Sequence, residues 1–339
     1  MSARRVAIVL FALIAGVVAW TAHSIFQPYA AFESPIRFEV ERGTSTLQLA
    51  ERLRKQGVIR WEWQFLLLRA LHPSAVLQAG EYSFSQPASP LTVFGRIARG
   101  DVFYYAISIP EGSNVFEIAG IVEETGIFSR QQFLAAAREP GLIRDLAPDA
   151  RSLEGYLFPS TYRITRYTTA PQLCKQMTDE FRKAWSGLGA RGNVHDVVTL
   201  ASLVEEETGD PAERALVASV FQNRLDRGHR LQCDPTTIYA ALLESRFDGV
   251  IHRSDLDSKH PYNTYQHPGL PPGPIANPGL ASLRAALQPA QTNFLFFVAK
   301  PGSRSHRFSA TLHEHEEAVA AYRRGIQNID MKPTSGEAQ

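Results

Sequence analysis

An unbroken apolar run near the N-terminus constrains this chain more than any other feature. The 17 residues from Val6 to Ala22 carry no charge, and Arg4 and Arg5 precede them. A helix that spans a bilayer needs roughly 17–25 such residues. Trp20 lies where an interfacial anchor would, and the positive-inside rule places the N-terminus in the cytoplasm and the chain after His23 outside.

The alternative to an anchor is a cleavable signal peptide. The apolar region of a signal peptide is usually only about 7–15 residues long, and it ends at a small-x-small cleavage site. No clear Ala-x-Ala sequence follows this run. We therefore favour an uncleaved single-pass anchor over residues 6–22, with residues 1–5 as a cytoplasmic tail and residues 23–35 as a short linker.

The composition excludes some classes of partner and leaves the redox state open. The chain has 339 residues, of which 44% are hydrophobic and 20% charged, which is typical of two or three globular domains. The net charge of +1 gives no bulk attraction to nucleic acid. Cys174 and Cys233 match no metal-binding spacing, and they could form a disulfide or stay free and buried.

A strand–turn–helix pattern occurs twice, 69 residues apart. Gly43 corresponds to Gly112, and Gly57 corresponds to Gly126. Each pattern closes on a glycine of the kind that ends helices. The repeat predicts two related β-α units within an N-terminal module over residues 36–130, although chance similarity of two common units is the alternative. Between the copies we expect a helix over 61–71 and a strand over 80–84.

The second half, residues 131–330, has the helical periodicity of a larger mixed domain. We expect helices over 171–188, 194–208, 211–227, 280–287 and 314–327, a buried strand over 294–298, and a partner strand over 307–309. Residues 260–279 contain six prolines, and a long irregular loop in a compact domain is often functional. The last residues, 331–339, are expected to be disordered. The predicted fold class is therefore α+β.

Three consecutive carboxylates, Glu205 to Glu207, end one of these helices. At about 100° per residue, Glu207 shares a face with Leu203 and Val204, whereas Glu205 and Glu206 point elsewhere. Burial would raise the pKa of a core-facing carboxyl, as a general acid requires. The alternative is a helix-end carboxylate paired with Arg214.

Most glycosidases need a second carboxylate near the acid. Those available in sequence have no diagnostic spacing: Asp210, Glu213, Asp234 and Asp255. For Asp234 a simpler interpretation is the N-cap of the helix that follows it.

Polar and aromatic side chains in the long loop suit sugar binding. Tyr262, Asn263, Thr264 and Tyr265 offer rings that could stack on sugar faces and groups that could bond to hydroxyls. The alternative is a proline-stiffened loop that only packs on the core. The histidines are scattered, so we predict no metal site and no cofactor.

Seven ordered motifs between residues 153 and 299 carry a family resemblance that covers nearly the whole chain. They are Leu153–Tyr162 (LEGYLFPSTY), Ala201–Thr208 (ASLVEEET), Val217–Leu225 (VASVFQNRL), Leu231–Tyr239 (LQCDPTTIY), Tyr262–Tyr265 (YNTY), Gly269–Gly279 (GLPPGPIANPG) and Phe294–Ala299 (FLFFVA). Through them the chain resembles the YceG-like family of endolytic murein transglycosylases of the bacterial inner membrane.

The resemblance implies a lyase that cuts β-1,4 MurNAc–GlcNAc bonds within nascent peptidoglycan strands. Such an enzyme leaves 1,6-anhydro-MurNAc ends and so limits glycan elongation. It implies a LysM-like module over 36–130 and a catalytic domain over 131–330, both periplasmic. The implied partners are glycan strands and the inner membrane, with a peptidoglycan synthase as a candidate and no nucleic acid.

The resemblance also assigns roles to residues. The family's catalytic glutamate directly precedes the threonine, which here is Glu207 before Thr208. The sugar's own 6-hydroxyl replaces water in such enzymes, so one carboxyl serves as acid and then base. Cys233 stands where relatives often have another small or polar residue, which leaves its role open. The motifs add three candidate substrate-binding residues to the loop residues and Asp234: Glu154, Gln232 and Tyr239.

Two other functions remain open on the sequence. A non-catalytic scaffold that binds the cell wall would need only the LysM-like module. A muramidase-type hydrolase would need a second carboxylate that activates water.

Overall fold

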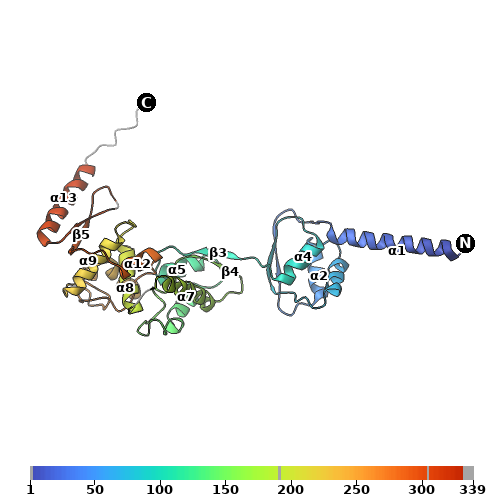
Figure 1. The fold of residues 1–339 in the computed structure, drawn as a ribbon, viewed down its shortest axis with the longest axis horizontal. Helices are drawn as coiled ribbons and strands as arrows, with labels where there is room; N and C mark the ends of the chain where they lie inside the picture. Colours follow the sequence, from blue (N-terminus) through green and yellow to red (C-terminus); the bar gives the residue numbers. More distant parts are fainter. Residues whose placement is uncertain (1–2, 190–191, 304, 331–339) are drawn as a thin grey trace, which may run out of the picture. The chain divides into compact units, whose positions relative to one another are not determined.

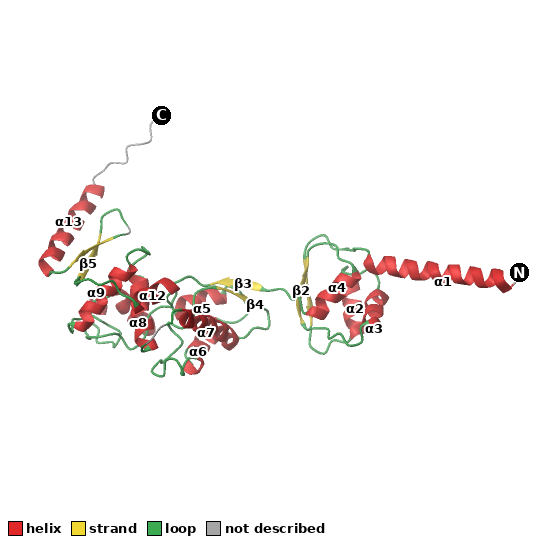
Figure 2. Cartoon of the chain, viewed as in Figure 1, coloured by secondary structure: helices red, strands yellow, loops and turns green. Residues whose placement is uncertain are grey.

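The computed structural model describes residues 3–189, 192–303 and 305–330, which form an α+β fold (Figures 1 and 2). The chain divides into two compact units. Unit 1 consists of residues 1–105 and 163–167, and unit 2 of residues 106–162 and 168–339. The predicted disordered tail, 331–339, lies outside the described residues, as do the first two residues of the predicted cytoplasmic tail.

Unit 1 joins a long N-terminal helix to a small α+β core. Its elements are α1 (Ala3–Phe26), β1 (Ile36–Val40), α2 (Thr46–Lys55), α3 (Glu62–Leu71), β2 (Gly80–Phe84) and α4 (Pro90–Arg99). Strands β1 and β2 pair antiparallel, from Ile36 opposite Phe84 to Val40 opposite Gly80. The predicted strand over 80–84 is confirmed, and the predicted helix over 61–71 is confirmed with Trp61 as its N-cap.

The predicted apolar helix is present and longer than expected. The segment Arg4–Phe26 is long and apolar enough to cross a membrane, by length and composition. Its last turn extends into the segment predicted to be a linker, where Ser24 and Ile25 are buried. The backbone N–H of Ala31 donates to the carbonyl of Gly57, so residues after the helix also pack on unit 1.

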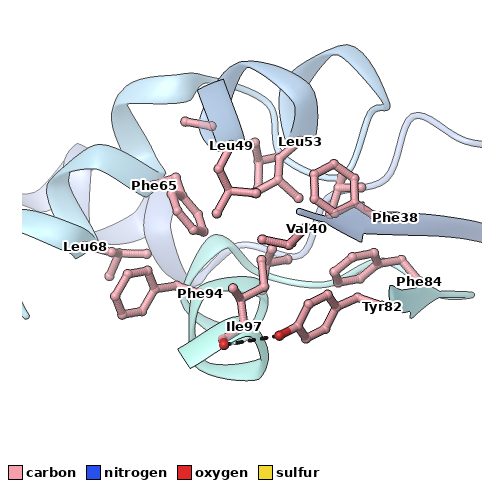
Figure 3. Packing of buried hydrophobic residues seen from close by; sticks show 14 of the residues in the cluster. Phe38, Val40, Leu49, Leu53, Phe65, Leu68, Tyr82, Phe84, Phe94 and Ile97 are labelled. Atoms are coloured by element: carbon pink, nitrogen blue, oxygen red, sulfur yellow. Dashed lines mark hydrogen bonds between the residues drawn. The ribbon is translucent and has the colours of Figure 1, made fainter. Parts of the chain in front are cut away.

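The core of unit 1 lies between the β1–β2 pair and helices α2, α3 and α4 (Figure 3). Aromatic and branched side chains fill it, including Phe38, Phe65 and Phe84, which are almost completely buried. The hydroxyl of Tyr82 donates to the carbonyls of Gln78 and Ile97 at 2.8 and 3.3 Å. A buried phenol in an apolar core needs such a partner.

Unit 2 is mainly helical. Strands β3 (Tyr105–Ser108) and β4 (Thr161–Ile164), which pair with each other, each contain residues of both units. The remaining elements all belong to unit 2: α5 (Val115–Glu123), α6 (Arg130–Ala137), the short 3-10 helix Pro140–Leu142, α7 (Ala170–Gly187), α8 (Val194–Glu207), α9 (Arg214–Asp226), α10 (Asp234–Leu243), α11 (Arg253–Leu256), α12 (Leu280–Leu287), β5 (Phe296–Ala299), β6 (His306–Ser309) and α13 (Leu312–Asp330). Strands β5 and β6 pair antiparallel. Cys174 and Cys233 are both free and buried.

The two predicted β-α copies have the same local structure. Gly43 and Gly112 turn with φ of +83° and +82°, and Gly57 and Gly126 follow the helices with φ of +71° and +68°. Helices α2 and α5 each begin with a capping box, at Ser45 and at Asn114.

The compact units divide after Tyr105, whereas the sequence predicted a division after residue 130. The second β-α copy therefore belongs with the helices of unit 2. Its turn exchanges backbone hydrogen bonds with Asn277: the Gly112 N–H donates to the Asn277 carbonyl at 3.0 Å, and the Asn277 N–H donates to the Ser113 carbonyl at 3.1 Å.

Candidate active site

Helix α8 carries the three carboxylates at its end and is buried on every side in about two turns before them. Asn193 caps it by accepting a hydrogen bond from the backbone of His195. All residues from Val198 to Val204 are buried, including those opposite the predicted face. Helical phase therefore could not by itself single out one of the carboxylates as the one that faces the protein.

Glu205 is the structural carboxylate of the three. It forms an ion pair with Arg214 at 3.1 Å, and both side chains are almost fully buried. It also accepts a hydrogen bond from the Gly279 N–H at the start of α12, at 2.8 Å. The helical period predicted that Glu205 points away from the core-facing side of α8. That prediction is wrong, because α9 and α12 cover its side of the helix. The Arg214 pairing that we considered for Glu207 belongs to Glu205.

Glu206 is exposed and lies beside the turn of the second β-α copy. A Cβ atom placed on Gly112 would lie 3.0 Å from Glu206 Oε1. Partial burial of the carboxyl, together with the negative charges of Glu117, Glu205 and Glu207, raises the pKa of Glu206 to about 7.

Glu207 is half-buried at the last position of α8 and contacts the start of α10. Burial raises its pKa, and the nearby charge of Asp234 acts in the same direction. A hydrogen bond from the Cys233 side chain opposes this rise, as does the positive charge of Arg224. A carboxyl in such surroundings tends to keep its proton at higher pH than an exposed one, as a general acid requires.

The start of α10 differs from the prediction. The N-cap is Cys233, which makes no side-chain capping hydrogen bond, and Asp234 is the first helical residue. The interpretation of Asp234 as the cap is therefore wrong. Instead its exposed carboxylate accepts a hydrogen bond from the hydroxyl of Tyr265 at 2.5 Å. Gln232, also exposed, adopts a positive φ of 52° just before this helix.

The polar groups of Asn263 and Thr264 are engaged inside the protein. Asn263 is fully buried, and its amide donates to the carbonyls of Asp255, Leu256 and Ser258 at 2.7–3.1 Å. The hydroxyl of Thr264 accepts from the Cys233 N–H at 3.0 Å. These bonds fix the loop against the end of α11 and the start of α10, which agrees with the packing alternative for these two residues. Tyr262 and Tyr265 are only partly buried.

Glu154 lies at the centre of a second, buried cluster. It accepts hydrogen bonds from the Val115 N–H at the start of α5, from the Tyr239 hydroxyl, and from the Asn277 amide, at 2.7–3.0 Å. Burial raises its pKa to about 8 in spite of these donors. Glu154 and Tyr239 thus hold α5, α10 and the proline-rich loop together, and Tyr262 packs on Tyr239 with ring centroids 5.1 Å apart.

Sequence reasoning missed the positions of Asn277, His306 and Arg224 near these groups. Asn277 lies in an Asn-Pro turn of the proline-rich loop, a signal that we could have used. Arg224 donates to the carbonyls of Leu231 and Leu295, which places its charge next to Glu207 without exposing it. His306 bonds Glu213 at 2.7 Å, and no local pattern announces that pair.

Among residues 3–189, 192–303 and 305–330, no group of three or more His, Cys, Asp and Glu side chains is arranged to hold a metal ion. The site is therefore best described by its carboxylates and their hydrogen-bond partners.

Comparison with known proteins assigns the family. Residues 38–321 match the model of the YceG-like family. An endolytic murein transglycosylase of Bacillus subtilis (strain 168) is 32% identical over 311 residues, which cover 86% of this chain and 85% of the relative. An endolytic murein transglycosylase of Streptococcus pneumoniae (serotype 2, strain D39) is 27% identical, over 84% of this chain and 57% of the longer relative.

A solved structure agrees with these matches. The crystal structure of a YceG-like protein from Listeria monocytogenes aligns with a TM-score of 0.54 and 28% sequence identity, over 84% of this chain and 99% of the other. The family model, which extends over most of the chain, and the 32% identity to the Bacillus relative lead to one assignment. The chain belongs to the YceG-like family.

Proposed function

We propose that this chain is an endolytic lytic transglycosylase that cuts β-1,4 bonds between MurNAc and GlcNAc within nascent peptidoglycan strands. The names of its Bacillus and Streptococcus relatives support this activity. The observation that carries the proposal is the environment of Glu207, a half-buried carboxyl at the end of α8 whose pKa burial raises. Cutting in this way forms 1,6-anhydro-MurNAc ends and limits glycan elongation.

Glu207 performs both proton transfers. Its protonated carboxyl donates to the glycosidic oxygen as the bond from that oxygen to C1 of MurNAc breaks. The 6-hydroxyl of the same MurNAc then bonds to C1, and its proton returns to the Glu207 carboxylate. No water enters the product, and the carboxyl ends in the protonation state in which it began.

Exposed groups near Glu207 are the best candidates for sugar contacts. Gln232, Asp234 and Tyr265 lie around the start of α10, and the Tyr265 hydroxyl holds the Asp234 carboxylate. Partly buried tyrosine rings such as Tyr262 could stack on sugar faces. Glu154, Tyr239, Asn263 and Thr264 act indirectly in this proposal, because their polar groups bond within the protein.

The experiment compares two adjacent carboxyls of the same helix. Full-length Glu207→Gln and Glu206→Gln are each incubated with purified glycan strands, and the products are analysed by mass spectrometry. Glu207→Gln should lose anhydro-product formation by a factor of about 100 or more, the usual size of a lost acid–base group. Glu206→Gln should stay within a few-fold of the wild type. Retained anhydro product in Glu207→Gln would overturn the mechanism.

The thiol of Cys233 provides a finer test. Its hydrogen bond lowers the pKa of Glu207 against the effect of burial. In Cys233→Ala that pKa should rise further, so the alkaline limb of the rate profile should move to higher pH. Cys174→Ala is the matched control, because Cys174 is also buried but lies in α7. Identical profiles for both variants would show that the thiol does not act on Glu207.

Two other functions give different products. A hydrolase would use Asp234, whose charge acts on Glu207, to activate water, and its product would be heavier by one water than the anhydro form. A cell-wall-binding scaffold would bind glycan equally well with and without the Glu207→Gln change and would cut in neither case. The same mass spectrometry experiment separates all three.

We also propose the placement of the chain in the cell. Helix α1 would cross the inner membrane once, with Arg4 and Arg5 on the cytoplasmic side and both units in the periplasm. Unit 1 would contain the LysM-like, glycan-binding module, and unit 2 the catalytic domain. A peptidoglycan synthase would be a natural partner, because the substrate is a strand still being made.

A further inference from the structure

Three tryptophans meet where α1 joins the rest of unit 1. Trp20 belongs to α1, and Trp61 and Trp63 lie at the start of α3. The ring of Trp20 lies 5.8 Å from that of Trp61 and 5.5 Å from that of Trp63, between centroids. Tryptophan is enriched at the interface between lipid and water. Because the three rings are in contact, the start of α3 would lie at the same depth in a membrane as Trp20.

Buried hydrogen bonds fix α1 to α3 at this point. The Gln64 amide donates to the carbonyl and to the hydroxyl of Ser24, at 2.9 and 2.7 Å, and both side chains are buried. A buried polar pair of this kind is costly to break. The outer end of α1 is thus a rigid part of unit 1.

Helix α3 has a second apolar face besides the one in the core. Phe65 and Leu68 are buried in the core, whereas Trp63, Leu67 and Leu71 recur every four residues on a neighbouring face. Leu67 is partly buried and also packs against the core. Leu71 is 63% exposed. This second face borders an apolar cavity of about 420 Å³.

The lining of that cavity points to lipid as its occupant. The α3 residues Leu67 and Leu71 line it together with Val17, Val18 and Ala22 of α1. These three belong to the apolar run that forms the proposed membrane span. The cavity is therefore continuous with the surface of α1 that would face acyl chains.

A positively charged side chain, that of Arg60, lies beside the tryptophans. The guanidinium of Arg60 lies 4.9 Å from the ring centroid of Tyr29 and 5.3 Å from that of Trp61. These residues line a separate pocket of about 280 Å³ that also includes Trp20 and His23. An exposed arginine held by aromatic rings at a membrane surface is placed to meet lipid phosphates.

We propose that unit 1 docks on the outer face of the bilayer through a lipid-facing surface formed by Trp20, Trp61, Trp63, Leu67 and Leu71, with Arg60 at the level of the lipid phosphates. This inference rests on the proposed membrane anchor and goes beyond it. Unit 1 is then held on the membrane rather than suspended from a flexible linker. Acyl chains fill the apolar cavity between α1 and α3.

The test measures the depth of single spin labels on the full-length chain in nanodiscs of phosphatidylethanolamine and phosphatidylglycerol. Leu71→Cys reports on the lipid-facing surface, and Leu47→Cys is the matched control, because Leu47 is a leucine of α2 with a similar exposed fraction, 58%. Labelled wild type gives the background of the two buried cysteines. The readout is the collision rate with oxygen relative to that with a water-soluble nickel complex.

The expected ratio is several-fold higher at Leu71 than at Leu47, because oxygen concentrates in lipid. A label at Val9, in the N-terminal third of α1, distinguishes the two proposals. A Val9 label in lipid, with the same oxygen-to-nickel ratio at Leu71 as at Leu47, would overturn the docking and leave the anchor intact. A Val9 label in water would overturn both.

A charge reversal tests the role of Arg60. Arg60→Glu should lower the oxygen-to-nickel ratio at Leu71 in nanodiscs rich in phosphatidylglycerol. Arg42→Glu, an equal charge change at another exposed arginine of unit 1, should leave that ratio unchanged. Equal ratios in the two variants would remove the phosphate contact from the proposal.

Discussion

The first β-α copy, β1 to α2, and the second, β3 to α5, make nearly the same turn in different surroundings. The turn glycines have φ values one degree apart, and both helices begin with a capping box. A Cβ on Gly43 would meet nothing within 4 Å, whereas one on Gly112 would press on Glu206. The buried Glu154 bonds the start of α5, while α2 is capped by exposed side chains.

This difference shows that a local motif and its role are decided separately. Turn and cap depend on residues within a few positions of each other, so a repeated sequence repeats them. The role depends on what packs against the motif. The second copy packs beside the carboxylates of α8, whereas the first copy lies at the surface of unit 1.

The largest expected effect concerns the two helix starts. Glu154→Ala leaves three buried donors without an acceptor, and each such loss costs roughly 1–3 kcal/mol, so the free energy of unfolding should fall by about 3 kcal/mol or more. Ser45→Ala removes only an exposed cap and should cost about 1 kcal/mol. Urea unfolding of the full-length chain, followed by circular dichroism, measures both. Equal losses would mean that the two copies are held equally.

The pH dependence of stability should also differ between the two helix starts, being strong for Glu154 at α5 and absent for Ser45 at α2. The pKa of Glu154 is raised from 4.5 to about 8 in the folded chain, so its contribution is fully present below pH 4.5 and is lost as the pH rises towards 8. The free energy of unfolding of the wild type, relative to Glu154→Gln, should therefore fall by a few kcal/mol across this range. The difference between the wild type and Ser45→Ala should stay flat, because no group at that cap ionises. A flat curve for Glu154 as well would contradict the raised pKa.

Substitutions of the two turn glycines should cost similar stability but differ in their effect on activity. Gly43→Ala and Gly112→Ala both place a side chain at positive φ, at a cost of about 1–2 kcal/mol each. Only at Gly112 does the new methyl approach the last turn of α8, 3.0 Å from Glu206 and next in sequence to Glu207. Anhydro-product formation should fall several-fold in Gly112→Ala and stay unchanged in Gly43→Ala. Similar rates in the two variants would show that the turn of the second copy does not influence the end of α8.

The smallest expected effect is a loss of stability that is larger in the first copy than in the second, which is the reverse of the preceding predictions. A Cβ on Gly57 would lie 2.9 Å from the Cβ of Ala31 and 3.1 Å from its carbonyl carbon, whereas one on Gly126 would meet nothing within 4 Å. Gly57→Ala should therefore destabilise the chain by about 1 kcal/mol more than Gly126→Ala. The difference between their urea midpoints checks this. A larger loss for Gly126→Ala would show that the comparison at the helix ends is wrong.

Local patterns predicted most helices and strands of this fold. The strand over 80–84 and the helix over 280–287 have the predicted bounds, because turn residues and a strong apolar period mark their ends. Helix α4 was missed, although Ser89 caps it and Pro90 begins it. The compact units divide after Tyr105, before the second copy, because the second copy makes its contacts within unit 2.

The candidate site was only partly predictable. The motif around Glu207 resembles the family's catalytic motif, yet helical phase gave no reliable support, since every residue of α8 from Val198 to Val204 is buried whichever way it points. The partner of Glu205 at the start of α12 lies 74 residues away, and the amide that bonds Glu154 lies 123 residues away. No periodicity contains information about such pairs.

The sequence by itself determined what neighbouring residues decide: an apolar segment long enough for a membrane, capped helices, glycine turns, and a family motif with three carboxylates. The tertiary structure decided which carboxylate is neutralised by Arg214, which is exposed beside Gly112, and which lies half-buried against Cys233. The reason is physical. The protonation of a carboxyl depends on burial and on charges within a few ångströms, and segments far apart in the chain supply these.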